Sequence, residues 1–214
     1  MTRLEIISDP ICPWCYIGKA KLDKALETAP NPFEITWRPF QLNPDMPATG
    51  MDRRAYLEGK FGKDRATPVY AQIEAAAVEA GLDVDFSQIK RTPNTVDAHR
   101  MIRWAKTSDH QTALVTELFA RYFKLGQDIS DHAILLNAAE VVGMDTEVMS
   151  RLLAGDVDRD VVIREDTEAR EMGVSGVPTF LIGGRYAVQG AQDAATWANI
   201  IAEISEASAA MPQQ

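Results

Sequence analysis

The only two cysteines of this 214-residue chain, Cys12 and Cys15, form a single Cys-Pro-Trp-Cys motif. Side chains three positions apart are neighbours on a helix, so the two sulfurs can form a reversible disulfide. A structural zinc site needs four ligands, usually including a second cysteine pair or paired histidines, and the three histidines here are not spaced in that way. The motif therefore predicts redox chemistry and no bound metal.

The residues around the motif predict a strand that runs into a helix. Residues 4–7 have the composition of a short buried strand, and residues 8–10 form a turn. Residues 16–27 have the apolar spacing of an amphipathic helix. A redox-active Cys-x-x-C motif requires this context of a strand followed by a helix.

Each residue of the motif has a predicted role. Pro13 fits the first helical position, because its missing N–H costs nothing there, and this makes Cys12 the N-cap. The unpaired amides at that end of the helix would stabilise a thiolate, so we predict Cys12 to be the nucleophile. Cys15, one turn into the helix, would be the more buried resolving thiol. Trp14 either contacts the substrate or covers the disulfide.

A second informative segment lies at residues 173–182, where the pattern predicts a helix end, a proline turn and a strand. A cis bond between Val177 and Pro178 would leave the backbone groups of Val177 free to pair with an extended peptide. Because only about 5–6% of X-Pro bonds in folded proteins are cis, the residues alone favour a trans bond.

These motifs together resemble the DsbA branch of the thioredoxin superfamily, and more narrowly its cytoplasmic FrnE-like group. The resemblance extends from Leu4 to about Ile204. It rests on five segments: Cys12-Pro13-Trp14-Cys15, Trp37-Arg38-Pro39-Phe40-Gln41-Leu42-Asn43-Pro44, Asn94-Thr95-x-x-Ala98-His99-Arg100, Gly176-Val177-Pro178-Thr179-Phe180 and Gly190-Ala191-Gln192.

The resemblance implies an α/β thioredoxin fold with a large inserted helical subdomain. Residues 1–40 and 174–207 would form the thioredoxin-like domain, and residues 41–173 would form the insertion. It also implies that Pro178 is cis and that Val177 and Pro178 face a peptide substrate beside the two cysteines.

Three further residues come from the same resemblance. In glutathione-using members of this fold, the region that corresponds to Asn94, Thr95 and His99 borders the substrate cleft. We therefore regard these three as candidate substrate-binding residues. Asn94 and Thr95 precede a predicted helix and have the residue types of a helix cap.

One position departs from the superfamily. Thioredoxin-like enzymes often carry a buried acid six residues before the first cysteine, where it accepts or relays the proton of the second thiol. Here that position is Ile6. Deprotonation of Cys15 would then rely on water, on Glu5 if its side chain turns inward, or on the departing substrate thiolate.

The region between Phe40 and Thr179 has a mostly helical pattern. Three of its predicted helices end in a glycine followed by an apolar residue, at Gly81, Gly143 and Gly173. Residues 41–62 predict a long loop that could border the Cys12 site, with at most a short helix near residues 53–57. The predicted helices are 67–80, 95–107, 110–124, 131–142, 145–154, 158–172 and 193–207, and a Gly183-Gly184 hairpin joins strands 179–183 and 186–190.

The charge and hydropathy of the chain argue against two classes of binding partner. A net charge of −9 and a pI near 4.9 argue against nucleic acid and anionic membranes. No stretch approaches the 18 uninterrupted apolar residues that a membrane-spanning helix needs.

The N-terminus enters the first strand directly and leaves no room for a signal peptide, so we expect a cytoplasmic protein. In that compartment a Cys-x-x-C motif is more often redox-active than structural.

Three classes of function remain. The first is a thiol–disulfide oxidoreductase, with or without isomerase activity, that acts on protein or small-molecule thiols, binds no cofactor and can use glutathione as a co-substrate. Reduction potentials in this fold run from about −270 to −120 mV, which leaves the direction of exchange open. The second is a glutathione-dependent isomerase or transferase of the kappa-class or 2-hydroxychromene-2-carboxylate isomerase type, whose members lack the second cysteine. The third is a non-enzymatic holdase that binds peptides beside Pro178.

Overall fold

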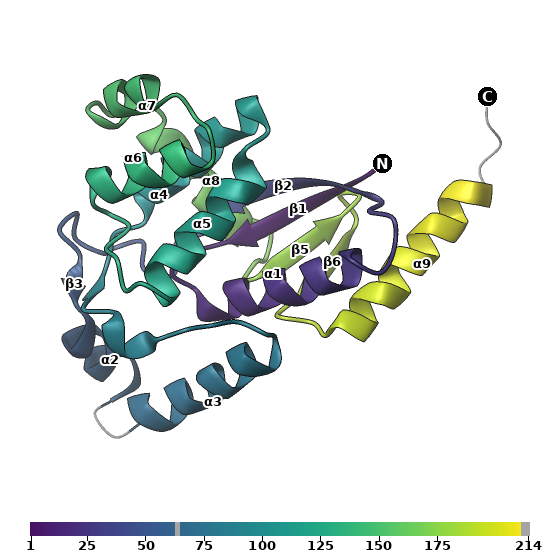
Figure 1. Ribbon diagram of the computed structural model, residues 1–214, viewed down its shortest axis with the longest axis horizontal. Helices are drawn as coiled ribbons and strands as arrows, with labels where there is room; N and C mark the ends of the chain where they lie inside the picture. Colours follow the sequence, from purple (N-terminus) through teal and green to yellow (C-terminus); the bar gives the residue numbers. More distant parts are fainter. Residues whose placement is uncertain (63–64, 211–214) are drawn as a thin grey trace.

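A four-stranded sheet lies at the centre of the computed structural model, which describes residues 1–62 and 65–210 (Figure 1). The strand order is β2-β1-β5-β6. β1 (Thr2–Ser8) runs parallel to β2 (Phe33–Pro39), while β5 (Thr179–Ile182) is antiparallel to β1 and pairs with β6 (Tyr186–Gln189). The carboxyl end of β1 points toward the helical part of the molecule (Figure 1), and the Cys-Pro-Trp-Cys motif follows directly.

The helices α2 to α8 lie between β2 and β5 in the sequence, which confirms the thioredoxin-type fold with a helical insertion. The boundaries that we predicted at residues 40/41 and 173/174 remain a proposal for how the chain divides. The helices are α1 (Pro13–Leu26), α2 (Arg53–Phe61), α3 (Ala66–Glu79), α4 (Val96–Ala105), α5 (Gln111–Phe123), α6 (His132–Val141), α7 (Thr146–Leu153), α8 (Arg159–Glu171) and α9 (Ala194–Ala210).

Two strands of two residues each form a second sheet that the sequence did not indicate. β3 (Met51–Asp52) pairs antiparallel with β4 (Arg91–Thr92). Strands this short show no alternation of apolar and polar residues, so periodicity cannot detect them. Two short 3-10 turns complete the secondary structure, at Phe86–Gln88 and Lys106–Ser108. In the described ranges, no helix has both the length and the apolar character needed to cross a membrane.

The three helix ends predicted from glycine are confirmed. Gly173 has a φ of 91°, which L side chains rarely adopt, and the next N–H, that of Val174, donates to the carbonyl of Ala169 at 3.1 Å. This bond closes the last turn of α8. α3 and α6 end in the same way at Gly81 and Gly143.

The sheet separates two apolar layers. On one face, Leu4 and Ile6 belong to a large core with α1 and α9, in which the fully buried ring of Trp197 packs edge-on against Phe180 at 4.7 Å between centroids. On the other face, Ile7 packs in a smaller cluster that includes a residue of α8. Alternation along β1 therefore sends successive side chains into different layers.

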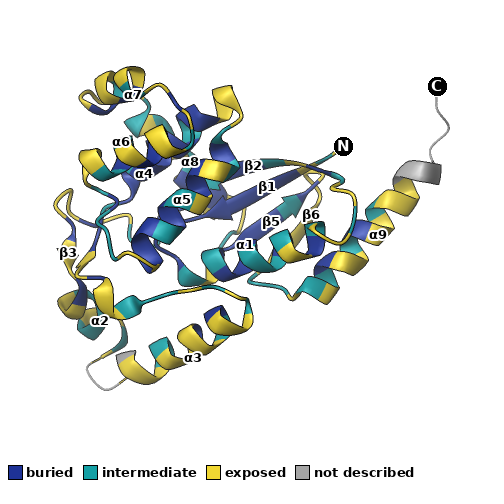
Figure 2. Cartoon of the chain, viewed as in Figure 1, coloured by how far each residue is buried: buried dark blue, intermediate teal, exposed yellow. Residues whose placement is uncertain are grey.

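α5 anchors the insertion to the motif helix. Tyr16 of α1 stacks on Phe119 and Phe123 of α5, with ring centroids 5.0 and 5.7 Å apart. These rings bury a large apolar area between the two helices. The buried face of α5 appears dark blue in Figure 2. Three α5 residues that recur at helical spacing are fully buried: Leu114, Leu118 and Tyr122.

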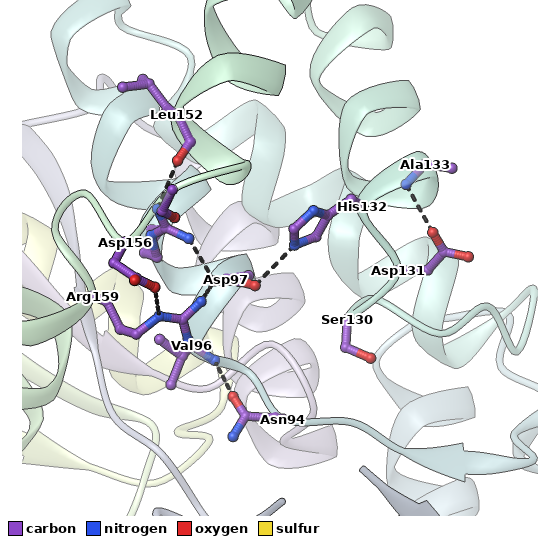
Figure 3. Close-up of polar contacts among 12 residues, drawn as sticks. Asn94, Val96, Asp97, Ser130, Asp131, His132, Ala133, Leu152, Asp156 and Arg159 are labelled. Atoms are coloured by element: carbon purple, nitrogen blue, oxygen red, sulfur yellow. Dashed lines mark hydrogen bonds and ion pairs between the residues drawn. The ribbon is translucent and has the colours of Figure 1, made fainter. Parts of the chain in front are cut away.

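A partly buried ion-pair cluster joins the helices of the insertion. Asp97 of α4 accepts hydrogen bonds from Arg100 and Arg159 at 2.8 Å each and contacts His132 of α6 at 3.0 Å (Figure 3). The Arg100 side chain is fully buried, and its other N–H groups donate to backbone carbonyls at the end of α7 and in the turn before α8. Because removing one partner of a buried pair leaves an uncompensated charge, this cluster fixes α4 relative to α6, α7 and α8. The carbonyls belong to Leu152, Gly155 and Val157.

Candidate active site

The Cys-Pro-Trp-Cys motif forms the first turn of α1. Cys12 is the N-cap in extended conformation and Pro13 occupies the first helical position, as predicted. Both cysteines are free thiols, lie close together and are buried, Cys12 at 3% exposure and Cys15 at 1%. Trp14 is 41% exposed at the tip of the helix. Within the described part of the chain, no group of three or more His, Cys, Asp or Glu residues is arranged to hold a metal ion.

The Val177–Pro178 segment lies directly against the first cysteine. The Sγ of Cys12 lies 3.5 Å from the carbonyl oxygen of Val177, which is 165 residues away in the sequence. The Val177–Pro178 bond is cis, as the family resemblance implied and contrary to the base rate for proline. The turn before β5 therefore brings a peptide backbone beside the thiol.

Gly18 permits this close approach. It lies inside α1, and a Cβ on Gly18 would lie 2.9 Å from the Cγ of Pro178 and 3.5 Å from the ring of Phe180. Glycine normally weakens a helix interior by about 1 kcal/mol relative to alanine. Here the missing side chain is what allows α1 to pack against the proline, a role that the sequence interpretation did not assign.

Gly18→Ala should therefore lower both stability and exchange activity, although alanine is the better helix former. We expect a net loss of about 1 kcal/mol or more from overpacking, and at least a tenfold slower exchange because Cys12 and Val177 separate. Gly59→Ala in α2 is the matched control, since nothing lies within 4 Å of its Cβ position. It should be neutral or stabilising. Urea unfolding and thiol-exchange rates measure both, and equal behaviour of the two variants would contradict this account.

The environment of Cys15 opposes its ionisation. Burial raises the pKa of the Cys15 thiol well above its ordinary value, and the neighbouring Cys12 raises it further. The hydroxyl of Ser8 and the backbone N–H of Asp9 act in the opposite direction. The sulfur of Cys15 is thus shielded from solvent near the end of β1, and its proton must pass either to a group of the protein or to the departing substrate thiolate.

Glu5 does not supply that acceptor. Its carboxylate lies 2.7 Å from a guanidinium nitrogen of Arg3 and 3.8 Å from one of Arg38. Strand alternation places Glu5 on the face of β1 opposite Ile6, and Ile6 shares its core with the cysteines. The inward orientation of Glu5 that we considered from the sequence is therefore wrong.

A different buried acid lies near the cysteines. Asp9 is fully buried, and its carboxylate accepts the N–H groups of Leu42 at 2.7 Å and Ile11 at 3.2 Å. Burial raises the pKa of Asp9 to about 7, against the lowering effect of these two hydrogen bonds. Its position between Ser8 and Pro10 had indicated only a turn, because the Leu42 contact is not visible in the sequence.

The three residues from the Asn94 region take structural positions. Asn94 donates to the carbonyl of Met46 at 2.7 Å and accepts the N–H of Val96 at 3.0 Å, so it holds the 41–50 loop and the start of α4. Thr95 is the buried N-cap. His99 is 3% exposed, and its Nε2 contacts the carbonyl of Phe40 at 3.2 Å. A role for these residues in substrate binding remains a prediction.

Arg53 is a buried cation that the sequence interpretation missed. Its guanidinium donates to the hydroxyls of Tyr70, Thr92 and Tyr122, and none of its hydrogen bonds in the described ranges goes to a carboxylate. Burial raises the pKa of Tyr70, and the charge of Cys12 adds to the rise, so this group lies within electrostatic reach of the thiol. The short β3–β4 sheet positions Arg53, and that sheet has no local signal in the sequence.

With this geometry established, comparisons with known proteins identify the family. Residues 3–202 match the family described as a DSBA-like thioredoxin domain. The chain belongs to this family.

Individual relatives agree with the assignment to the DsbA-like family. The uncharacterized protein YwbO of Bacillus subtilis is 27% identical over 182 residues, which cover 85% of this chain and 86% of YwbO. A probable DsbA oxidoreductase of Streptomyces coelicolor has 29% identity and a TM-score of 0.85, covering 100% of this chain and 93% of that one. The cytosolic disulfide reductase DsbM of Pseudomonas aeruginosa, solved with GSH, has a TM-score of 0.70 at 15% identity, with 95% and 99% covered.

Proposed function

We propose that this DsbA-like protein is a cytoplasmic thiol–disulfide oxidoreductase that works through Cys12 and Cys15. The observation that carries the proposal is the contact between the Cys12 sulfur and the Val177 carbonyl at the start of α1. A substrate disulfide that reaches Cys12 would meet a peptide backbone at Val177 and the exposed ring of Trp14. The second thiol lies one turn away, ready to resolve the mixed disulfide.

The exchange would proceed in two steps. The Cys12 thiolate attacks one sulfur of the substrate disulfide, and the other substrate sulfur leaves as a thiolate. Cys15 then attacks the sulfur of Cys12, which forms the Cys12–Cys15 disulfide and releases the second substrate thiolate. The cysteine pair loses two electrons and the substrate gains two. In the reverse direction the same steps oxidise a substrate dithiol and reduce the Cys12–Cys15 disulfide. Isomerisation would instead need a second substrate thiol to displace Cys12 from the mixed disulfide, with no net transfer of electrons.

Glutathione is the small-molecule thiol that we propose as co-substrate. It carries two carboxylates, and Arg53 offers a buried guanidinium whose described partners are neutral hydroxyls. Arg53 also lines a pocket of about 500 Å³, whose other charged side chains are the bases Arg54 and Lys90 and the acids Asp52 and Glu58. The structural likeness to DsbM, described as a cytosolic disulfide reductase and solved with GSH, supports both the co-substrate and the compartment.

Arg53→Met should raise the KM for glutathione by about tenfold, which corresponds to about 1.4 kcal/mol, and leave the KM for uncharged 2-mercaptoethanol unchanged. Arg164→Met in α8 is the matched control, because the Arg164 side chain is 57% exposed, pairs with Glu168 and does not line this pocket. Steady-state kinetics with the two thiols measure the effect. An equal rise for both thiols would assign Arg53 a structural role instead.

The reduction potential of the cysteine pair tests the proposed function directly. The protein is equilibrated in glutathione buffers while Trp14 fluorescence and thiol trapping report the two-electron step. A potential near or above about −200 mV would identify an oxidant or isomerase, and one near −270 mV a reductase. If no reversible disulfide forms, the proposed function is wrong.

A further inference from the structure

We propose that Ser8, His99 and Asp9 form the path by which Cys15 loses its proton when it attacks the mixed disulfide. This inference rests on the proposed function and concerns its second step. It places the buried acid of this protein at Asp9, directly after β1, instead of at the position of Ile6 that thioredoxin-like enzymes often use.

The path begins at the hydroxyl of Ser8. This oxygen is buried and forms no hydrogen bond with the residues that the structure describes, yet it lies close enough to Cys15 to favour the thiolate. A buried polar group without a partner needs an explanation. A hydroxyl both donates and accepts, so Ser8 can take the Cys15 proton while passing on its own.

A small cavity connects Ser8 with His99. It has a volume of about 10 Å³, enough for about one water molecule, and both residues line it together with Trp37 and Arg38. His99 also lines a second, larger pocket of about 320 Å³, which shares Trp37 and Arg38 with the first. His99 thus links the cavity beside Ser8 with a larger pocket that offers a route toward solvent.

The hydrogen bonds of His99 determine which nitrogen can accept a proton. Its Nε2 must donate to the Phe40 carbonyl at 3.2 Å, since a carbonyl can only accept. This leaves Nδ1 as the acceptor. The same Nε2 lies 3.9 Å from the Oδ1 of Asp9. Burial lowers the pKa of His99 to about 4 and raises the pKa of Asp9 to about 7, so a proton that reaches His99 comes to rest on the Asp9 carboxylate. The pair takes up one proton without a net buried positive charge.

Several charged groups surround this pair. Asp166 of α8 raises the pKa of Asp9, Lys60 of α2 lowers it, and Arg170 of α8 contacts Asp166 at 3.1 Å. Asp9 in turn raises the pKa of Tyr122 in α5. Burial is therefore the main cause of the raised pKa of Asp9, and the charges of Asp166 and Lys60 add smaller effects of opposite sign.

The attack of Cys15 on the mixed disulfide breaks two bonds and forms one between the two cysteines. The S–H bond of Cys15 breaks, and its proton passes through Ser8 and a water molecule to the His99–Asp9 pair. Cys15 forms a sulfur–sulfur bond with Cys12, and the bond between Cys12 and the substrate sulfur breaks. The substrate leaves as a thiolate with the electron pair of that bond. The pair then returns the proton to solvent.

The test isolates this second step with 5,5′-dithiobis(2-nitrobenzoate). The reduced protein releases one thionitrobenzoate when Cys12 attacks and a second when Cys15 resolves the mixed disulfide. In the wild type, the second rate should rise to about pH 7 and then level. In Asp9→Asn it should fall at least tenfold at pH 7 and rise tenfold per pH unit from 6 to 9, because hydroxide must remove the proton. The first rate should not change.

Two further variants provide an independent test of the path and a control. Ser8→Ala removes only the hydroxyl and should slow the second phase in the same way, which covers the case of an unfolded Asp9→Asn. Glu34→Gln, at an exposed acid of β2 that lines neither cavity, should leave both phases unchanged. A wild-type pH profile in folded Asp9→Asn or Ser8→Ala, or a slowed second phase in Glu34→Gln, would overturn the path. Absence of both phases from the wild type would instead overturn the proposed function.

Discussion

Cys12→Ser should abolish disulfide exchange, with a loss of at least about 1000-fold, which corresponds to about 4 kcal/mol of transition-state stabilisation. The serine hydroxyl keeps the shape of the N-cap and its place beside Val177, but it is not ionised near neutral pH and cannot form a disulfide. Stability should change little, because serine is a good N-cap residue. The assay is reduction or oxidation of a model disulfide, with unfolding in urea as the folding check.

Cys15→Ser is the informative partner of this variant. It should retain the first attack and then accumulate a mixed disulfide at Cys12, because no thiol resolves it. Mass spectrometry with glutathione disulfide should show a single added glutathione. If Cys15→Ser instead kept full turnover of a glutathione-dependent reaction, the kappa-class or isomerase alternative would replace the proposed function. Protection of client proteins by a variant that lacks both cysteines would favour the holdase.

The pH dependence of stability should separate Asp9 from His99. Burial raises the pKa of Asp9 from 3.8 to about 7, so the folded state binds more protons than the unfolded state between these values. This contribution to stability falls as pH rises, by about 4 kcal/mol. Burial lowers the pKa of His99 from 6.5 to about 4, so its contribution rises with pH by about 3 kcal/mol over that range. The two slopes nearly cancel in the wild type.

Relative to the wild type, the stability of the two single variants should therefore change with pH in opposite directions. Relative to the wild type, Asp9→Asn should gain stability as pH rises from 4 to 6.5, while His99→Gln, which can still donate to the Phe40 carbonyl, should lose stability from pH 4 to 7. The double variant should again follow the wild-type profile. Urea unfolding of the reduced protein at pH 4.5, 5.5, 6.5 and 7.5 measures all four proteins. If the stability of both single variants changed with pH in the same way as that of the wild type, the pKa shifts assigned to Asp9 and His99 would be wrong.

Local features of the chain were predictable because their causes lie within a few residues. The position of Pro13 makes Cys12 an N-cap, and each of the three helix ends needs only a glycine and the apolar residue after it. The burial of Leu114 and Leu118 follows from helical spacing alone. Family resemblance then supplied the thioredoxin fold and the cis bond before Pro178, neither of which spacing could provide.

Tertiary structure decided the surroundings of the thiols. The carboxylate of Asp9 meets the N–H of Leu42, 33 residues later, and the hydroxyls around Arg53 come from residues up to 69 positions away. Burial at such contacts, rather than residue type, makes an acid hold its proton near pH 7 and leaves a guanidinium beside neutral partners. The sequence by itself determined which atoms can exchange electrons, whereas only the folded chain decided where their protons can go, because desolvation depends on every segment that packs against the site.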